Sequence, residues 1–244
     1  AIEAAPEDYR NHLQMGDFYI KSDRFTEAAR HFRKTVELVP DESFARFALG
    51  TACLYLGQFT EAEKELRLAL QLGETPAALH ALGLILTYQG RDREAIPFIS
   101  SALNKSPKQY LWWINLGIAY RRINLTALSE RANRSGLEAA ESEMRKNPRD
   151  GHVRACMAYL CARLGDRHRA KSEIDQALSL SPDKTETRWL AVETYEALGQ
   201  REEALSVLKS LSWEVLADMS RYPDLADIHK DPRFIQLLSS SKIR

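Results

Sequence analysis

Apolar side chains recur along this chain at the three- and four-residue spacing of amphipathic helices, in segments of about 12 to 14 residues. Within these segments a two-residue pattern, Leu or Met followed by Gly, returns with a nearly fixed period. The four glycines are 34, 33 and 34 residues apart. The four pairs are Met15-Gly16, Leu49-Gly50, Leu82-Gly83 and Leu116-Gly117. Such a period predicts a repeated structural unit, and it is the first feature on which the fold depends.

Other positions keep the same phase. Tyr19 and Tyr120 each stand three residues after the glycine. The position twelve residues after the glycine is alanine in five repeats: Ala28, Ala62, Ala95, Ala170 and Ala204. Prolines close four repeats, at Pro40, Pro107, Pro148 and Pro182, and Glu74 takes that place in the second repeat. Because proline cannot continue a helix, these positions mark where the second helix of each unit ends.

The recurrence of these residue types at fixed positions of the repeat has a simple physical meaning. Small residues at the Gly and Ala positions allow the two helices of a hairpin to approach closely, while larger residues such as Phe32 fill the gaps between them. An isolated amphipathic helix of this length is marginal in water, so each hairpin must stack on its neighbours to bury its remaining apolar face.

The pattern predicts six repeats, followed by a different C-terminal segment. Their expected bounds are 9–42, 43–75, 76–109, 110–150, 151–184 and 185–211, with a capping segment at 212–244. Residues 1–8 are interpreted as the last turn of an earlier, truncated repeat, because Pro6 lies 34 residues before Pro40. We therefore expect the parent protein to continue upstream.

The fourth repeat is longer than the others. Pro148 lies 41 residues after Pro107, an excess of seven. Seven residues are almost two helical turns, so the second helix should lengthen without rotating its apolar face. Gly136 in its middle is expected to weaken it. The extension is interpreted either as a plain protrusion or as a docking element, and the sequence leaves both open.

The repeat signature ends near residue 211. Trp213 and Leu216 belong to a further predicted helix that covers the last hairpin. Asp231 followed by Pro232 predicts a helix start, with an N-cap and a proline at the first helical position. Phe234, Leu237 and Leu238 would anchor this last short helix.

Composition and charge narrow the function classes. Lys plus Arg and Asp plus Glu are both 34, so no overall charge favours nucleic acid or an acidic membrane surface. No apolar run reaches the roughly 20 residues needed to span a bilayer, and no signal peptide is recognisable. Three cysteines give no disulfide framework; Cys53 and Cys161 are expected to be buried, inert thiols, which favours a reducing, cytoplasmic compartment.

On these residues the chain is identified as a member of the tetratricopeptide-repeat (TPR) family. The resemblance implies an all-α fold, a right-handed superhelix (an α-solenoid of helix-turn-helix hairpins) with a C-terminal capping helix. Three segments further resemble the C-terminal TPR regions of bacterial signalling proteins, which follow a serine/threonine kinase or a transcriptional regulator. The segments are Tyr120-Arg121-Arg122, Asn147-Pro148-Arg149-Asp150 and the tail through Asp231-Pro232-Arg233-Phe234. The family's carboxylate clamp for chaperone tails is disfavoured, because Leu13 and Asp17 stand at its first two positions.

The same resemblance places a peptide-binding groove on the first helix of each repeat. Apolar and aromatic residues through the middle, with arginines beside them, suit a peptide with hydrophobic anchors and a carboxylate or phosphate. The alternative is that such side chains only pack between adjacent repeats. The candidate groove residues are Phe44, Phe47, Tyr55, Leu84, Tyr88, Ile118, Arg121, Arg122, Tyr159, Arg163 and Trp189.

No enzyme motif is recognisable, and no cofactor or metal is expected: the chain has no phosphate-binding glycine loop, nucleophile elbow or HExxH motif. His31, His168 and His229 are expected at the surface, and Glu193 with Glu196 in a solvated acidic patch. The expected partner is a protein or peptide, with no small-molecule substrate. Between residues 108 and 154, nine Lys or Arg against five Asp or Glu leave +4, so RNA binding remains an alternative, as does self-association.

Overall fold

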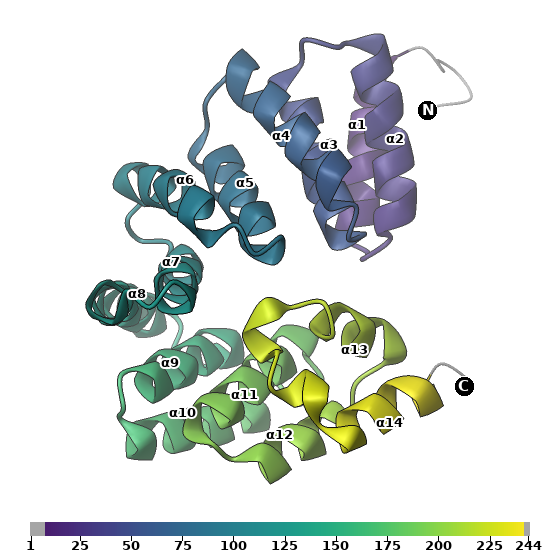
Figure 1. The fold of residues 1–244 in the computed structure, drawn as a ribbon. Coiled ribbons are helices and arrows are strands. Elements are labelled where there is room, and N and C mark those ends of the chain that lie inside the picture. The colour runs from purple at the N-terminus through teal and green to yellow at the C-terminus, as the bar shows by residue number, and fades with distance from the viewer. Residues whose placement is uncertain (1–7, 242–244) are drawn as a thin grey trace. The chain divides into compact units, whose positions relative to one another are not determined.

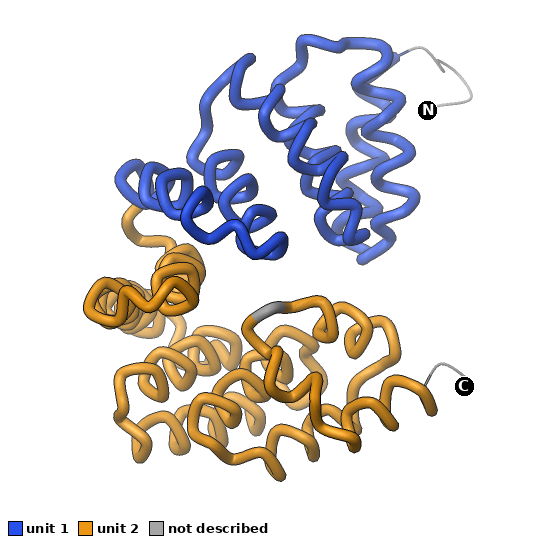
Figure 2. The backbone as a smooth tube through the Cα atoms, viewed as in Figure 1, with its two compact units in different colours: residues 1–106 blue, residues 107–244 orange. Residues whose placement is uncertain are grey.

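The structure is a computed structural model, and it describes residues 8–241. The predicted remnant of an earlier repeat, residues 1–8, lies outside this range except for Asp8. The described residues form α-helices, two 3-10 turns and no strand, which confirms the all-α prediction. The chain divides into two compact units, residues 1–106 and 107–244 (Figure 2).

Unit 1 contains three helical hairpins (Figure 1). In each, the first helix packs against the second, and the second helix of the first two hairpins also packs against the first helix of the next hairpin. The helices are α1 (Tyr9–Ile20), α2 (Phe25–Leu38), α3 (Ser43–Tyr55), α4 (Phe59–Leu72), α5 (Pro76–Tyr88) and α6 (Asp92–Lys105).

Unit 2 contains three more hairpins and the C-terminal segment (Figure 1). Its hairpin helices are α7 (Tyr110–Arg122), α8 (Thr126–Lys146), α9 (Gly151–Arg163), α10 (Arg167–Leu180), α11 (Thr185–Leu198) and α12 (Arg201–Leu208). The segment after them forms α13 (Trp213–Met219), two 3-10 turns η1 (Pro223–Leu225) and η2 (Ile228–Lys230), and α14 (Pro232–Ser241). First helices therefore begin at residues 9, 43, 76, 110, 151 and 185.

The repeated glycines are points of close helix approach within the hairpins. A Cβ atom on Gly16 would lie 2.4 Å from the Phe32 ring, and one on Gly83 would lie 2.4 Å from Ile99 Cγ1. In each hairpin the contacting side chain stands sixteen residues after the glycine, on the second helix. The fourth repeat keeps this geometry with a polar residue, because Asn133 Oδ1 would lie 2.4 Å from a Cβ on Gly117.

The turn inside each hairpin uses a left-handed residue, a feature that the repeat pattern had not singled out. Four of these residues are glycines, Gly57, Gly90, Gly165 and Gly199, with φ between 70° and 84°. The other two are Asp23 (φ 56°) and Asn124 (φ 61°). Asn and Asp tolerate this conformation better than other non-glycine residues, so the turn survives their substitution for glycine.

The prolines that close the repeats end a helix, and their carbonyl oxygens also accept a hydrogen bond from the following helix. A long side chain six residues after the proline donates a hydrogen bond to the proline carbonyl oxygen. The donors are Arg46 Nε to Pro40 (2.7 Å), Trp113 Nε1 to Pro107 (2.8 Å), Arg154 Nη2 to Pro148 (3.2 Å) and Arg188 Nε to Pro182 (2.6 Å). These bonds tie the connection between two hairpins to the first helix of the following one.

The lengthened helix of the fourth repeat is α8, which has 21 residues where most of its counterparts have 14. The difference of seven equals the excess read from the sequence. Gly136 is not simply a weak point in this helix, because a Cβ there would lie 3.0 Å from Trp113 Cβ and 3.2 Å from Leu160 Cδ2. The glycine allows α8 to lie close to both neighbouring first helices.

The C-terminal segment forms helices where the sequence predicted them. Asp231 accepts a hydrogen bond from the backbone N–H of Arg233 at 3.0 Å, and Pro232 is the first residue of α14. Phe234 is buried and stacks on the His229 ring, 5.6 Å between centroids. All three cysteines are buried, which confirms the predicted burial of Cys53 and Cys161, and burial raises the pKa of the Cys161 thiol to about 11.

His31 was expected at the surface, and that prediction is wrong. Its side chain is buried in the first hairpin, with Nδ1 3.0 Å from Nδ1 of His12 and its ring stacked on Tyr19. Burial, and then the neighbouring His12 and Arg30, lower the pKa of His31 below its ordinary value of 6.5.

The His31 imidazole should therefore titrate below 6.5 in an NMR pH titration. Because its folded pKa is lower than its unfolded value, the stability it contributes is present above pH 6.5 and is lost as the pH falls below that value. A His31→Gln variant should lose less of the α1 and α2 amide protection between pH 7 and pH 5.5 than the parent protein. A His31 resonance that titrates above 6.5 would contradict this account.

Candidate functional site

The candidate groove residues of unit 1 lie on α3 and α5. Phe44 and Tyr55 expose 47% and 54% of their surface, which is unusual for such large apolar rings. Phe47, Leu84 and Tyr88 are partly buried. We call these five residues, Phe44, Phe47, Tyr55, Leu84 and Tyr88, the aromatic face of unit 1.

Ring contacts fix several of these side chains. Phe44 and Phe47 lie on successive turns of α3, with centroids 6.2 Å apart. Tyr55 stacks on Phe25 at 4.4 Å, and the Tyr88 and Phe59 rings are 5.4 Å apart. Phe25 and Phe59 begin the second helix of the preceding hairpin, so the two tyrosines also seal the junction between hairpins. Phe44 and Tyr55 are thus held by neighbouring rings while about half exposed, which reduces the entropy that binding of a peptide must offset.

Four of the six candidate residues of unit 2 lie at a cluster of charges: Arg121, Tyr159, Arg163 and Trp189. Arg121 lies in the last turn of α7, Arg163 ends α9, and both guanidinium groups contact the carboxylate of Asp224 in η1. Arg121 Nη2 donates to Oδ1, and Arg163 Nη2 lies 3.3 Å from Oδ2. Only 1% of the Asp224 side chain is exposed, against 37% for Arg121 and 19% for Arg163. The arginine closest to solvent is therefore Arg121.

Aromatic residues surround this cluster. The Arg163 guanidinium lies over the Tyr159 ring, 5.1 Å from its centroid. Trp189 on α11 packs edge to face with Tyr222, at 5.6 Å between centroids. We call Arg121, Arg163, Tyr159, Trp189 and Glu193, together with Tyr222 and Asp224 of the tail, the arginine cluster of unit 2.

Glu193 is the unexpected member of the cluster. The sequence assigned it to a solvated acidic patch, and that prediction is wrong, because only 4% of its surface is exposed. Burial, and then the charge of Asp224, raise the pKa of Glu193 to about 8, although Arg163 and Arg121 act in the opposite direction. The carboxyl group is therefore largely protonated at neutral pH.

The cluster is not fully satisfied by its own hydrogen bonds. Glu193 Oε1 and Arg163 Nε are buried and have no hydrogen-bond partner within the described part of the chain. Such unpaired groups are uncommon in protein interiors. Burial also raises the pKa of the Tyr159 phenol above its ordinary value, so it stays protonated and can donate.

The remaining candidates differ in exposure. Ile118 and Tyr159 expose only 2% and 1% of their surface, so a partner cannot reach them directly in this conformation. Arg122 and Trp189 are partly buried. Sequence reasoning missed Glu193, although it stands at the same repeat position as Tyr159. It also missed Tyr222 and Asp224, which no repeat pattern could have placed against the first helices.

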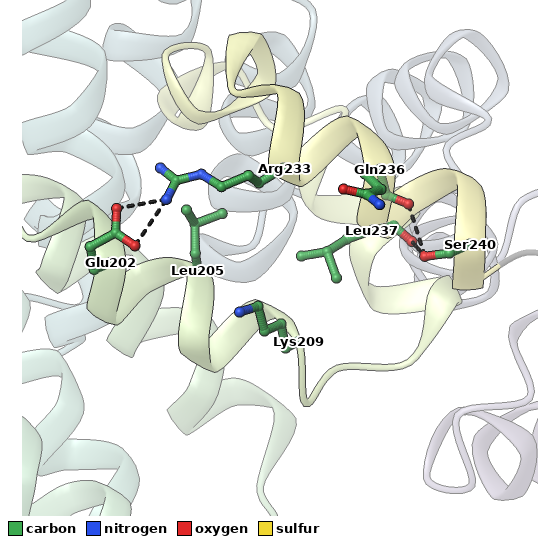
Figure 3. A pocket seen from close by; sticks show the side chains of 7 residues that line it. All are labelled: Glu202, Leu205, Lys209, Arg233, Gln236, Leu237 and Ser240. Atoms are coloured by element: carbon green, nitrogen blue, oxygen red, sulfur yellow. Dashed lines mark hydrogen bonds and ion pairs between the residues drawn. The ribbon is translucent and has the colours of Figure 1, made fainter.

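A further hollow of about 280 Å³ lies between α12 and α14 (Figure 3). It is lined by Glu202, Leu205, Lys209, Arg233, Gln236, Leu237 and Ser240. Arg233 Nη1 donates to both oxygens of Glu202, at 2.7 and 2.9 Å, and this pair ties the last helix to the last hairpin.

The described residues contain no group of three His, Cys, Asp or Glu side chains placed to hold a metal ion. None of the helices among them combines the length and the apolar character needed to cross a membrane. Exposed aromatic rings and arginines are residue types enriched at recognition surfaces.

Comparison with protein families finds three matches, all to tetratricopeptide-repeat models. They cover residues 13–78, 78–109 and 157–184. The fourth and sixth repeats, which carry the long α8 and the tail contacts, lie outside these matches.

One curated relative is the cellulose synthase operon protein C of Salmonella typhimurium, strain LT2. It is 28% identical over 164 residues, which is 65% of this chain but only 14% of that protein. The chain therefore spans about one seventh of the length of this relative.

Solved structures share the fold at low identity. PilW, described as a type IV pilus biogenesis factor, has a TM-score of 0.59 at 16% identity, covering 94% of this chain and 98% of its own. A chain of the APC/C hetero-tetramer Cut9–Hcn1 has a TM-score of 0.66 at 16% identity, and the match covers 98% of this chain and 44% of that one. YrrB, described as a TPR protein with an unusual peptide-binding site, has a TM-score of 0.50 at 16% identity. That match covers 76% of this chain and 93% of YrrB.

Proposed function

Because this chain is a tetratricopeptide-repeat protein, and therefore a protein-protein interaction module, we propose that it binds a partner peptide or helix through the first helices of its hairpins. We propose further that it belongs to a larger bacterial signalling or regulatory protein, acts in the cytoplasm and has no catalytic role of its own. The resemblance of its Tyr120-Arg121-Arg122 and C-terminal motifs to such proteins supports this context.

The observation that carries the binding proposal is the aromatic face of unit 1. Phe44 and Tyr55 are held by neighbouring rings yet remain about half exposed. Large rings that are rigid and exposed are typical anchors at protein interfaces. YrrB, which shares the fold, is described as a TPR protein with an unusual peptide-binding site, and a peptide ligand for this chain is consistent with that description.

The test uses peptides selected from a random library against the full chain. We expect Phe44→Ala and Tyr55→Ala each to weaken binding of a selected peptide by about tenfold or more, since truncating a hot-spot residue costs about 2 kcal/mol or more and about 1.4 kcal/mol is already tenfold. Fluorescence polarisation with labelled peptide measures the change, and circular dichroism verifies that each variant is folded.

Leu72→Ala is the matched control. Leu72 is 43% exposed, like Phe44, but it ends a second helix, α4. Its truncation should leave the affinity unchanged. If Leu72→Ala weakens the selected peptides as much as Phe44→Ala does, the binding face has been assigned to the wrong helices.

A further inference from the structure

The tail of the chain lies against the first helices of unit 2 as a bound peptide would. Residues 222–225 place three side chains there, and Tyr222, Asp224 and Leu225 are all nearly inaccessible to solvent. Tyr222 packs on Trp189, and the Asp224 carboxylate is held by one arginine at each oxygen. An aromatic anchor followed two residues later by a carboxylate thus occupies the arginine cluster.

Two features indicate that this occupant can be exchanged. Arg121 exposes more than a third of its side chain, so a competing carboxylate can reach it from solvent. Asp224 also leaves the site incompletely satisfied, because Arg163 Nε and Glu193 Oε1 have no partner although they are buried. A foreign carboxylate that engages an arginine through two parallel hydrogen bonds would gain contacts that Asp224 does not make.

We infer that residues 222–225 are an internal pseudo-ligand, which occupies the arginine cluster until a partner segment with an acidic residue two positions after an aromatic one displaces it. This inference rests on the proposed function, because it assumes that the first helices are the recognition surface. A tethered segment competes at an effective concentration of about a millimolar, so the tail raises the affinity threshold for any partner.

The probe is a labelled synthetic peptide with the sequence of residues 218–228, titrated against the full chain. With Asp224→Asn the internal segment is weakened, and we expect the peptide to bind this variant at least about tenfold more tightly than the parent protein. The same peptide carrying asparagine at the position of Asp224 should lose that binding. Asp227→Asn is the matched control, since its side chain is 85% exposed and pairs only with Lys230 among the ion pairs found.

Equal affinity of the peptide for the parent protein and for Asp224→Asn would overturn the inference, and so would failure of the peptide to bind either. Should Asp224→Asn fail to fold, the parent protein supplies the test. Several millimolar free peptide should then speed hydrogen exchange at the amides of residues 224–226, while the asparagine peptide should not; unchanged exchange would likewise overturn the inference. A different result would contradict the proposed function, namely that Phe44→Ala and Tyr55→Ala leave the affinity for the selected peptides unchanged.

Discussion

Replacing Gly50 with leucine is expected to destabilise the protein by about 1–3 kcal/mol or more, one of the two largest effects that the fold predicts for a single substitution. A Cβ atom at this position would lie 2.7 Å from Leu66 Cγ and 3.2 Å from the Ala62 carbonyl oxygen. Leu66 and Ala62 are fully buried in α4, so neither can move aside without disturbing the next hairpin. The gain in helix propensity from removing a glycine, about 1 kcal/mol, opposes this loss but is smaller than the clash expected for a whole leucine side chain.

Thermal unfolding followed by circular dichroism measures the effect, and a protein of about 150–250 residues loses roughly 2–4 °C in Tm for each kcal/mol. Gly73→Ala is the control in the same unit. A Cβ there would touch only the Ser43 side chain, at an ordinary 3.4 Å, so its Tm should stay close to that of the parent protein. An unchanged Tm for Gly50→Leu would mean that α3 and α4 do not approach each other at this glycine.

Replacing Glu193 with glutamine should stabilise the protein, and the gain should grow with pH. The pKa of Glu193 is raised from its ordinary value of 4.5 to about 8 in the folded chain. The stability that the protonated carboxyl contributes is therefore fully present below pH 4.5 and is lost as the pH rises toward 8. The slope is at most about 1.4 kcal/mol per pH unit, so the difference from glutamine should reach the order of 3 kcal/mol near pH 7.

Urea denaturation of both proteins at several pH values between 4.5 and 8.5 tests whether the stability difference between them grows with pH. The variant keeps all the groups that face Glu193, namely Arg121, Arg163, Asp224, Tyr159, Trp189 and Cys156. Glu186→Gln, an exposed glutamate in the first turn of the same helix, should show no such pH-dependent gain. A Glu193→Gln variant whose advantage disappears as the pH rises would mean that this carboxyl is ionised in the folded protein.

The repeated part of the fold was predictable because its physical causes are local and periodic. Two helices approach each other closely in every repeat, and only small residues fit where they do. This is why glycines such as Gly50 and Gly83, and the alanine twelve residues after each, recur with the period of the repeat. The excess of seven residues before Pro148 appears directly as the length of α8, and Asp231-Pro232 as the start of α14.

The arginine cluster was only half predictable. Arg121, Tyr159 and Arg163 follow from their repeat positions, but their partner Asp224 comes from an irregular segment that has no period to read. The same cause explains the error at Glu193 and the low exposure of Tyr159. A position that would face solvent in an open stack of hairpins becomes buried when a distant part of the chain covers it. His31 was misjudged for a similar reason, because its burial depends on its partner His12 in the other helix of the hairpin.

The central claim is that the first helices of the hairpins recognise a polypeptide. Hydrogen-exchange mass spectrometry of the full chain, with and without a selected peptide at saturation, tests it most directly. The account predicts slower exchange in the first helices of the hairpins, above all in α3 and α5 around Phe44 and Tyr88, with little change in α4 and α6. Protection confined to the second helices of the hairpins would contradict it.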